Sequence, residues 1–212
     1  ATQGPALVRP AVCDEALRLA ALLRRLLPDE PAVLGLSALL LLTDARRDAR
    51  TVNDELVLLT DQDRSHWRWN DVDLGLSLAA QALRRAGDRP GPWVLQAAIA
   101  ACQVAPDPDR HAIVALYDRL AALTPSPAVL ANRAAAIALA DGPTAGLAAL
   151  EEIEPAPGDH RVLVLRAELH AQLGRLDRAR AFLREAIEAT RNEIERRHLL
   201  RRLADLDRIR SG

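Results

Sequence analysis

The chain contains no lysine and no methionine, and it has only three tryptophans, one tyrosine and one phenylalanine in 212 residues. All 28 basic residues are therefore arginine, and 29 acidic residues bring the formal net charge to −1. This balance argues against a dedicated nucleic-acid binder, which normally carries a basic excess or a basic face. Because aromatic and β-branched residues are scarce while alanine and leucine abound, the composition excludes most sheet-based folds and predicts an all-α protein.

Cysteine and long apolar runs are scarce as well. Cys13 and Cys102 stand alone, without a CxxC or histidine-rich neighbourhood, so we expect reduced, buried thiols in a cytoplasmic protein. The longest apolar stretch, around residues 33–42, is much shorter than the roughly 20 residues that span a bilayer, and no membrane partner is predicted. No initiator or signal region precedes Ala1, which predicts a processed chain or, as we expect, one cut from a longer protein.

Two regions with different patterns are expected along the chain. Residues 1–90 predict a helical subdomain, whose helical spacing lapses in an irregular segment at 51–65. From residue 91 to 212, helix pairs recur about every 33 residues, which is typical of a helical solenoid. The predicted units are 92–125, 126–157 and 160–191, followed by a capping helix at 192–210.

The clearest of these units, 160–191, resembles a tetratricopeptide repeat. Ala167 and Ala179 place small side chains where the two helices would cross, and Gly174 would make the turn between them. Small residues allow paired helix backbones to approach closely, so they favour a tight antiparallel hairpin. The predicted fold is therefore an all-α, tetratricopeptide-like helical-hairpin solenoid preceded by an additional helical subdomain.

A more specific resemblance covers nearly the whole chain. It rests on the ordered segments Cys13–Leu19, Pro28–Leu36, Asp44–Arg47, Leu58–Trp67, Gly91–Ala101, Ala115–Asp118, Leu123–Pro127 and Asn132–Ala134. Together they resemble the C-terminal extension of one subgroup of extracytoplasmic-function (ECF) RNA polymerase sigma factors.

This resemblance implies a regulatory, accessory domain that follows a two-part sigma factor and is needed for its activity in transcription initiation. It implies contacts with the sigma core of the same protein, with RNA polymerase or with another protein, in place of a separate anti-sigma factor. It also implies no direct DNA contact by this chain, whose arginines alternate with acidic residues instead of forming a basic recognition helix. The alternative function is a stand-alone tetratricopeptide-type scaffold that binds a peptide or protein.

The segment from Asp61 to Trp67 is the most unusual local sequence. We expect Asp61, Asp63, Arg64 and Trp67 to form a junction between the N-terminal helices and the solenoid, or a partner-contact surface. Acidic residues before a helix commonly cap it, and Arg64 could pair with a neighbouring carboxylate. A hard-metal site is the less favoured interpretation, because the segment lacks the glycine and the terminal glutamate of a calcium loop.

Polar residues on the first helices of the predicted repeats are candidates for partner binding. They are Gln96, Asn132, Arg133, Arg166 and Glu168. Arginine and asparagine offer several donors that could hold a peptide backbone or carboxylate. Equally, these side chains could satisfy helix ends or pair across repeats. The sequence has no GxSxG, GxGxxG, HExxH or P-loop motif, so it nominates no catalytic residue, metal ligand or cofactor, and we expect no enzyme.

Overall fold

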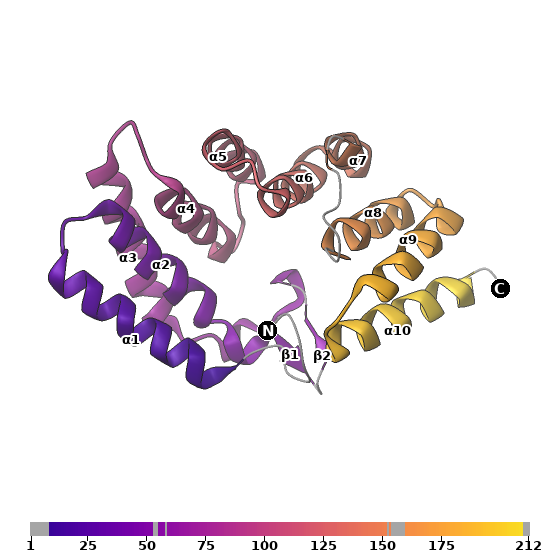
Figure 1. Cartoon of the computed structure of the whole chain (residues 1–212), viewed down its shortest axis with the longest axis horizontal. Helices are drawn as coiled ribbons and strands as arrows, with labels where there is room; N and C mark the ends of the chain where they lie inside the picture. Colours follow the sequence, from indigo (N-terminus) through magenta and orange to yellow (C-terminus); the bar gives the residue numbers. More distant parts are fainter. Residues whose placement is uncertain (1–8, 53–54, 58, 152, 154–159, 210–212) are drawn as a thin grey trace. The chain divides into compact units, whose positions relative to one another are not determined.

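The computed structural model describes residues 9–52, 55–57, 59–151, 153 and 160–209, and these ranges form an all-α protein, which confirms the predicted fold class (Figure 1). The helices are α1 (Pro10–Leu26), α2 (Pro31–Asp44), α3 (Trp69–Ala86), α4 (Pro92–Val104), α5 (Arg110–Leu123), α6 (Pro127–Asp141), α7 (Pro143–Glu151), α8 (His160–Gln172), α9 (Leu176–Ala189) and α10 (Glu193–Ile209). Within these ranges, no helix combines the length and the apolar character that a membrane crossing requires.

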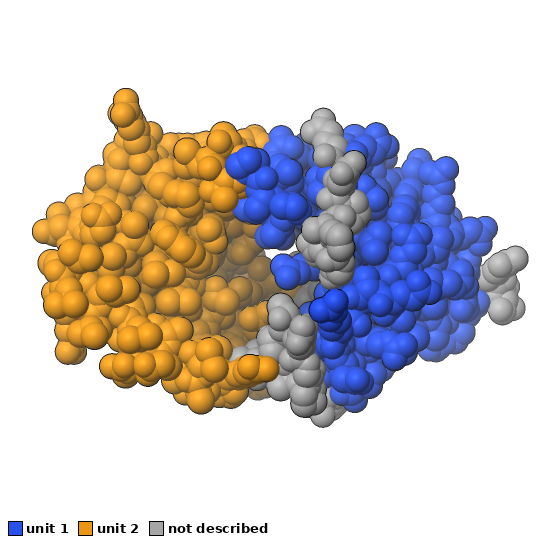
Figure 2. Space-filling model, in the orientation of Figure 1, with its two compact units in different colours: residues 1–7, 125–212 blue, residues 8–124 orange. Residues whose placement is uncertain are grey.

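The chain divides into two compact units, residues 8–124 and residues 125–212 (Figure 2). The predicted boundary after residue 90 falls between α3 and α4, inside the first unit. There α4 packs against both α2 and α3, so the first predicted repeat shares a unit with the N-terminal helices.

Helix α2 lies at the centre of the first unit, where it packs against α1, α3 and α4. It is apolar nearly all round, and Leu34, Ala38 and Leu42 on it are fully buried. The backbone of α4 approaches α2 so closely that a Cβ on Gly35 would lie 2.9 Å from the carbonyl atoms of Trp93. A helix that is apolar on every face requires neighbours on several sides, and α2 has them.

The irregular segment predicted at 51–65 lies in the first unit, and its residues 53–54 and 58 fall outside the described residues. It contains a minimal antiparallel pair, β1 (Thr51–Val52) with β2 (Glu55–Leu56), and the short 3-10 turns η2 (Leu59–Asp61) and η3 (Arg64–His66). A further 3-10 turn, η1 (Arg47–Ala49), follows α2. Cys13 and Cys102, in this same unit, are half-buried free thiols.

The second unit is built from the helical hairpins α6–α7 and α8–α9, with α10 packed on α9. Gly142 and Gly174 occupy the turns with φ of +94° and +71°, a region that favours glycine. Ala167 and Ala179 are buried as the repeat pattern predicts, and Leu199 of α10 joins the same core. Residues 152 and 154–157 of the second predicted repeat, and residue 210 of the predicted cap, lie outside the described residues.

Candidate functional site

The five residues predicted to bind a partner are spread over three helices. Gln96 is half-buried on α4 of the first unit, and the other four lie in the second unit. Asn132 is exposed and Arg133 half-buried on α6, while Arg166 and Glu168 are half-buried on α8.

Arg166 and Glu168 both have intramolecular partners. Arg166 donates hydrogen bonds to the carbonyl oxygens of Leu150 (3.0 Å) and Ile153 (3.2 Å), where α7 ends. Leu150 lies in the last turn of α7, where carbonyl oxygens lack the amide partner that a further helical turn would supply, and a cation there also complements the helix dipole. Glu168 accepts a hydrogen bond from Arg202 of α10. Both side chains therefore contribute to packing between helices.

The segment from Asp61 to Trp67 forms a junction within the first unit. Asp63 accepts a hydrogen bond from the Ser65 backbone at 2.8 Å and caps η3, and its interaction with Ser65 lowers the pKa of the carboxyl. Among the described residues, Arg64 has no carboxylate partner of the kind that the sequence suggested. Its guanidinium donates to the carbonyl oxygens of Val104 (3.1 Å) and Ala105 (2.9 Å), at the end of α4.

Trp67 anchors this junction in the core. Its side chain is 4% exposed and packs among residues of α2, α3 and α4. The guanidinium of Arg64 lies 4.8 Å from the centroid of the Trp67 ring, and that of Arg46 lies 5.9 Å from it, distances typical of cation–π contacts. Asp61 is exposed at the end of η2. Among the side chains that the structure describes, no cluster of histidine, cysteine and carboxylates is arranged to hold a metal ion.

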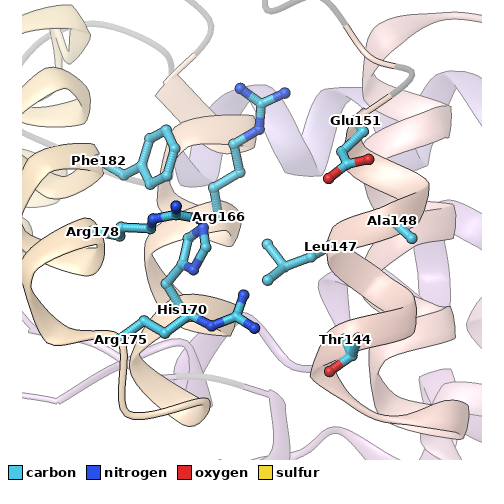
Figure 3. A pocket seen from close by; sticks show the side chains of 9 residues that line it. All are labelled: Thr144, Leu147, Ala148, Glu151, Arg166, His170, Arg175, Arg178 and Phe182. Carbon is cyan, nitrogen blue, oxygen red and sulfur yellow. The ribbon is translucent and has the colours of Figure 1, made fainter.

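A pocket that sequence reasoning missed lies in the second unit, between α7 on one side and α8 and α9 on the other (Figure 3). Its volume is about 370 Å³, which falls within the size range of ligand sites. Leu147 and Glu151 of α7 form one wall, and Arg166 and His170 of α8 lie across from them. Phe182 and Arg178 of α9, with Arg175 at the N-cap of that helix, also line the pocket.

The spacing of these residues explains why they meet. Arg175, Arg178 and Phe182 are separated by three and four residues, so they lie on one face of α9. Arg166 and His170 are four residues apart and share a face of α8. This periodicity is visible in the sequence, but the pocket exists only because α7 packs beside α8.

Stacked rings line the wall of the pocket. The imidazole of His170 stacks on Phe182 with ring centroids 5.5 Å apart and an interplanar angle of 8°. The guanidinium of Arg166 lies 5.9 Å from the centroid of Phe182. Because Arg166 is also tied to the end of α7, this wall is held by contacts from all three helices.

The pocket is strongly electropositive. Burial first, and then the charges of Arg178, Arg175 and Arg166, lower the pKa of His170. His170 is 7% exposed, and its Nδ1 atom has no hydrogen-bond partner. Among the described residues that line this pocket, Glu151 is the one that is acidic. The arrangement can hold a negatively charged group and can supply one further hydrogen bond from a buried nitrogen.

Comparisons with known proteins give two matches. Residues 1–83 match a family described as a family of unknown function (DUF6596). An uncharacterized protein of Rhizobium meliloti (strain 1021) is 41% identical over 97% of this chain and 50% of its own length. The chain therefore spans about half the length of the curated relative that it matches. No solved structure matches it significantly.

Proposed function

We propose that this chain is the regulatory, accessory C-terminal part of a bacterial ECF RNA polymerase sigma factor, and that it acts in transcription initiation through protein–protein contacts. The ordered sequence resemblance, which runs from α1 to α6, supports this assignment. The Rhizobium relative has a further stretch of comparable length, as a protein with a two-part sigma core would. On this proposal the chain works in the cytoplasm and needs no cofactor.

The observation that carries a role in protein contact is an exposed apolar face on α1. Val12, Leu19 and Leu26 are 61%, 45% and 68% exposed and lie on one stripe of the helix. Leu22, Leu23 and Leu27 flank the stripe and are exposed as well. Apolar surface concentrated in this way on a soluble chain typically marks an interaction site. We therefore place the contact with the sigma core or with polymerase on this face.

Charge pairing in the first unit favours a protein partner over DNA. Arg47 forms ion pairs with Asp14 and Asp44, and Arg68 with Asp44 and Asp71. Arginines engaged in this way are not arranged to neutralise phosphates. We accordingly expect that the isolated chain does not bind promoter DNA sequence-specifically with a low-micromolar Kd at physiological salt. Fluorescence anisotropy of labelled promoter DNA would measure this.

The direct test is a pull-down of the chain with an ECF sigma core and with core polymerase, followed by cross-link mapping. A double variant, Leu19→Glu with Leu26→Glu, should weaken binding about tenfold or more because it charges the apolar face. The matched control, Leu123→Glu with Leu200→Glu, changes two leucines of comparable exposure elsewhere and should bind as the wild type does. Failure of the wild type to bind either target, or equal losses in both variants, would contradict the proposal.

The alternative function is a stand-alone scaffold that binds a peptide. The basic pocket of the second unit favours this alternative, because such a pocket could hold an acidic peptide. The two functions are distinguished by the genomic reading frame. Polymerase-binding and helix-turn-helix regions encoded upstream would support the sigma-factor role. An initiator methionine directly before Ala1 would instead favour the scaffold.

A further inference from the structure

We propose that the pocket between α7, α8 and α9 binds an acidic segment of a partner protein, with Arg175 and Arg178 holding its carboxylates. The inference rests on the proposed function as a protein-contact module, because it names the chemistry of one such contact. The site lies wholly within the second unit. It is distinct from the apolar face of α1, and of the five residues predicted to bind a partner it contains only Arg166.

The two arginines at the edge of the pocket are available to a ligand. Arg175 and Arg178 are exposed and make no ion pair with any described residue. Arg180, two residues after Arg178 and therefore on another face of α9, shows the contrast, since it is buried and paired with Asp177 and Asp207. Guanidinium groups bind carboxylates through charge-assisted and often bidentate hydrogen bonds. A pair of them on one helix face is suited to carboxylates presented side by side.

The buried nitrogen of His170 points to a ligand independently of the arginines. Buried polar atoms in proteins nearly always have a hydrogen-bond partner, yet Nδ1 of His170 has none among the residues that the structure describes. The ring lies in the pocket beside the three arginines (Figure 3). A carboxylate held by Arg175 and Arg178 could accept a hydrogen bond from Nδ1–H and satisfy this atom.

The opposite wall favours a peptide over a compact inorganic anion. Glu151 faces the basic side from α7 (Figure 3), so it opposes a doubly charged phosphate but can accept a hydrogen bond from a peptide N–H. Leu147 and Phe182 supply apolar surface for a neighbouring aliphatic side chain. Alternating acidic and aliphatic residues would match these walls.

The test uses the 212-residue chain and a fluorescein-labelled, amidated hexapeptide of alternating glutamate and leucine. Binding is measured by anisotropy at about 50 mM salt, where screening is weak. The double variant Arg175→Gln with Arg178→Gln should bind about tenfold more weakly. The control, Arg184→Gln with Arg191→Gln, removes the same charge at two exposed positions outside the pocket and should bind as the wild type does. Circular dichroism checks that both variants fold.

A second readout reports on the site itself. In the NMR titration of the wild type, the bound peptide should raise the pKa of His170, because its carboxylates offset the arginine charges that lower it. A hexapeptide with glutamine in place of glutamate should cause no such change.

Three results would overturn the inference: no binding of the acidic peptide, equal losses in the pocket variant and the control variant, or equal binding of the glutamine peptide. Displacement by inorganic phosphate at concentrations similar to the peptide would also overturn it, in favour of a small-anion site. Neither sigma factor nor polymerase is present in this assay. Its failure therefore leaves the proposed function standing, and failure of the sigma pull-down leaves the pocket result standing.

Discussion

Replacing Gly146 by alanine should destabilise the protein, although the same change in an exposed helix normally stabilises it. Gly146 lies within α7, and a Cβ placed on it would be 2.4 Å from Cβ of Ala138 and 3.1 Å from the carbonyl oxygen of Ala134, both on α6. Non-bonded carbon atoms normally rest about 3.5–4.0 Å apart. The methyl group can therefore be accommodated only if the two helices of the hairpin separate by about 1 Å.

Two opposing effects determine how much free energy of unfolding the Gly146→Ala variant loses. Overpacking typically costs about 1–3 kcal/mol, and the upper end applies here because backbone atoms of α6 bound the site. The higher helix propensity of alanine, compared with glycine, offsets about 1 kcal/mol of this loss. The net loss in the free energy of unfolding should be about 2 kcal/mol. For a chain of this length that unfolds as a whole, the melting temperature should fall by about 4–8 °C.

Thermal and urea unfolding followed by circular dichroism would measure this loss. The control for the clash is Ala138→Gly, which by itself should cost about 1 kcal/mol through helix propensity. The double variant, Gly146→Ala with Ala138→Gly, should lose about 2 kcal/mol less free energy of unfolding than the sum of the two single losses. The reason is that the Ala138 methyl group, which the new Cβ would overlap, is absent. A Gly146→Ala variant that melts at or above the wild-type temperature would refute the close approach of α6 and α7.

Further predictions concern other positions in both units. Ala179→Leu should lower the free energy of unfolding by about 1–3 kcal/mol through overpacking of the buried α8–α9 crossing, and an unchanged melting temperature would contradict the repeat register. Arg64→Met, which keeps the apolar stem, should cost about 1–3 kcal/mol in urea unfolding because two hydrogen bonds to the end of α4 are lost. The pKa of His170 is lowered in the folded chain, so its contribution to stability is complete above about pH 6.5 and declines as the pH falls below that value. His170→Phe, which preserves the ring stack, should flatten this part of the profile of unfolding free energy against pH. An unchanged profile would contradict the contribution assigned to His170.

Much of the fold follows from short-range patterns in the sequence. The hairpin α8–α9 was predicted from Ala167, Ala179 and Gly174, because helix spacing and a glycine at the turn are local properties. The irregular segment at 51–65 was predicted for the same reason, since helical periodicity lapses there. The position of α4 was not predicted. It packs on α3, which precedes it, and on α2, which is about 50 residues away in the sequence, whereas the linker at residues 87–91 suggested a boundary.

The candidate sites show the same division. Asp63 was expected to cap a helix, and it caps η3. The partners of Arg64 could not be foreseen, because they are carbonyls about 40 residues further along the chain. The basic pocket was missed because its residues come from three helices. Of the residues that line the pocket, the sequence analysis proposed only Arg166 as a binding residue, because it lies on the first helix of a predicted repeat.

The sequence by itself determined which segments are helical, where the hairpins of the second unit turn and which faces are apolar, because each of these depends on neighbours within about one or two turns. Tertiary structure alone decided that Arg64 closes the end of α4 and that Arg175, Arg178 and His170 converge opposite α7. It also decided that the apolar stripe of α1 remains exposed while α2 is covered. The physical reason is that burial and charge clustering depend on which helices become neighbours, and helix packing fixes that choice only when the whole chain folds.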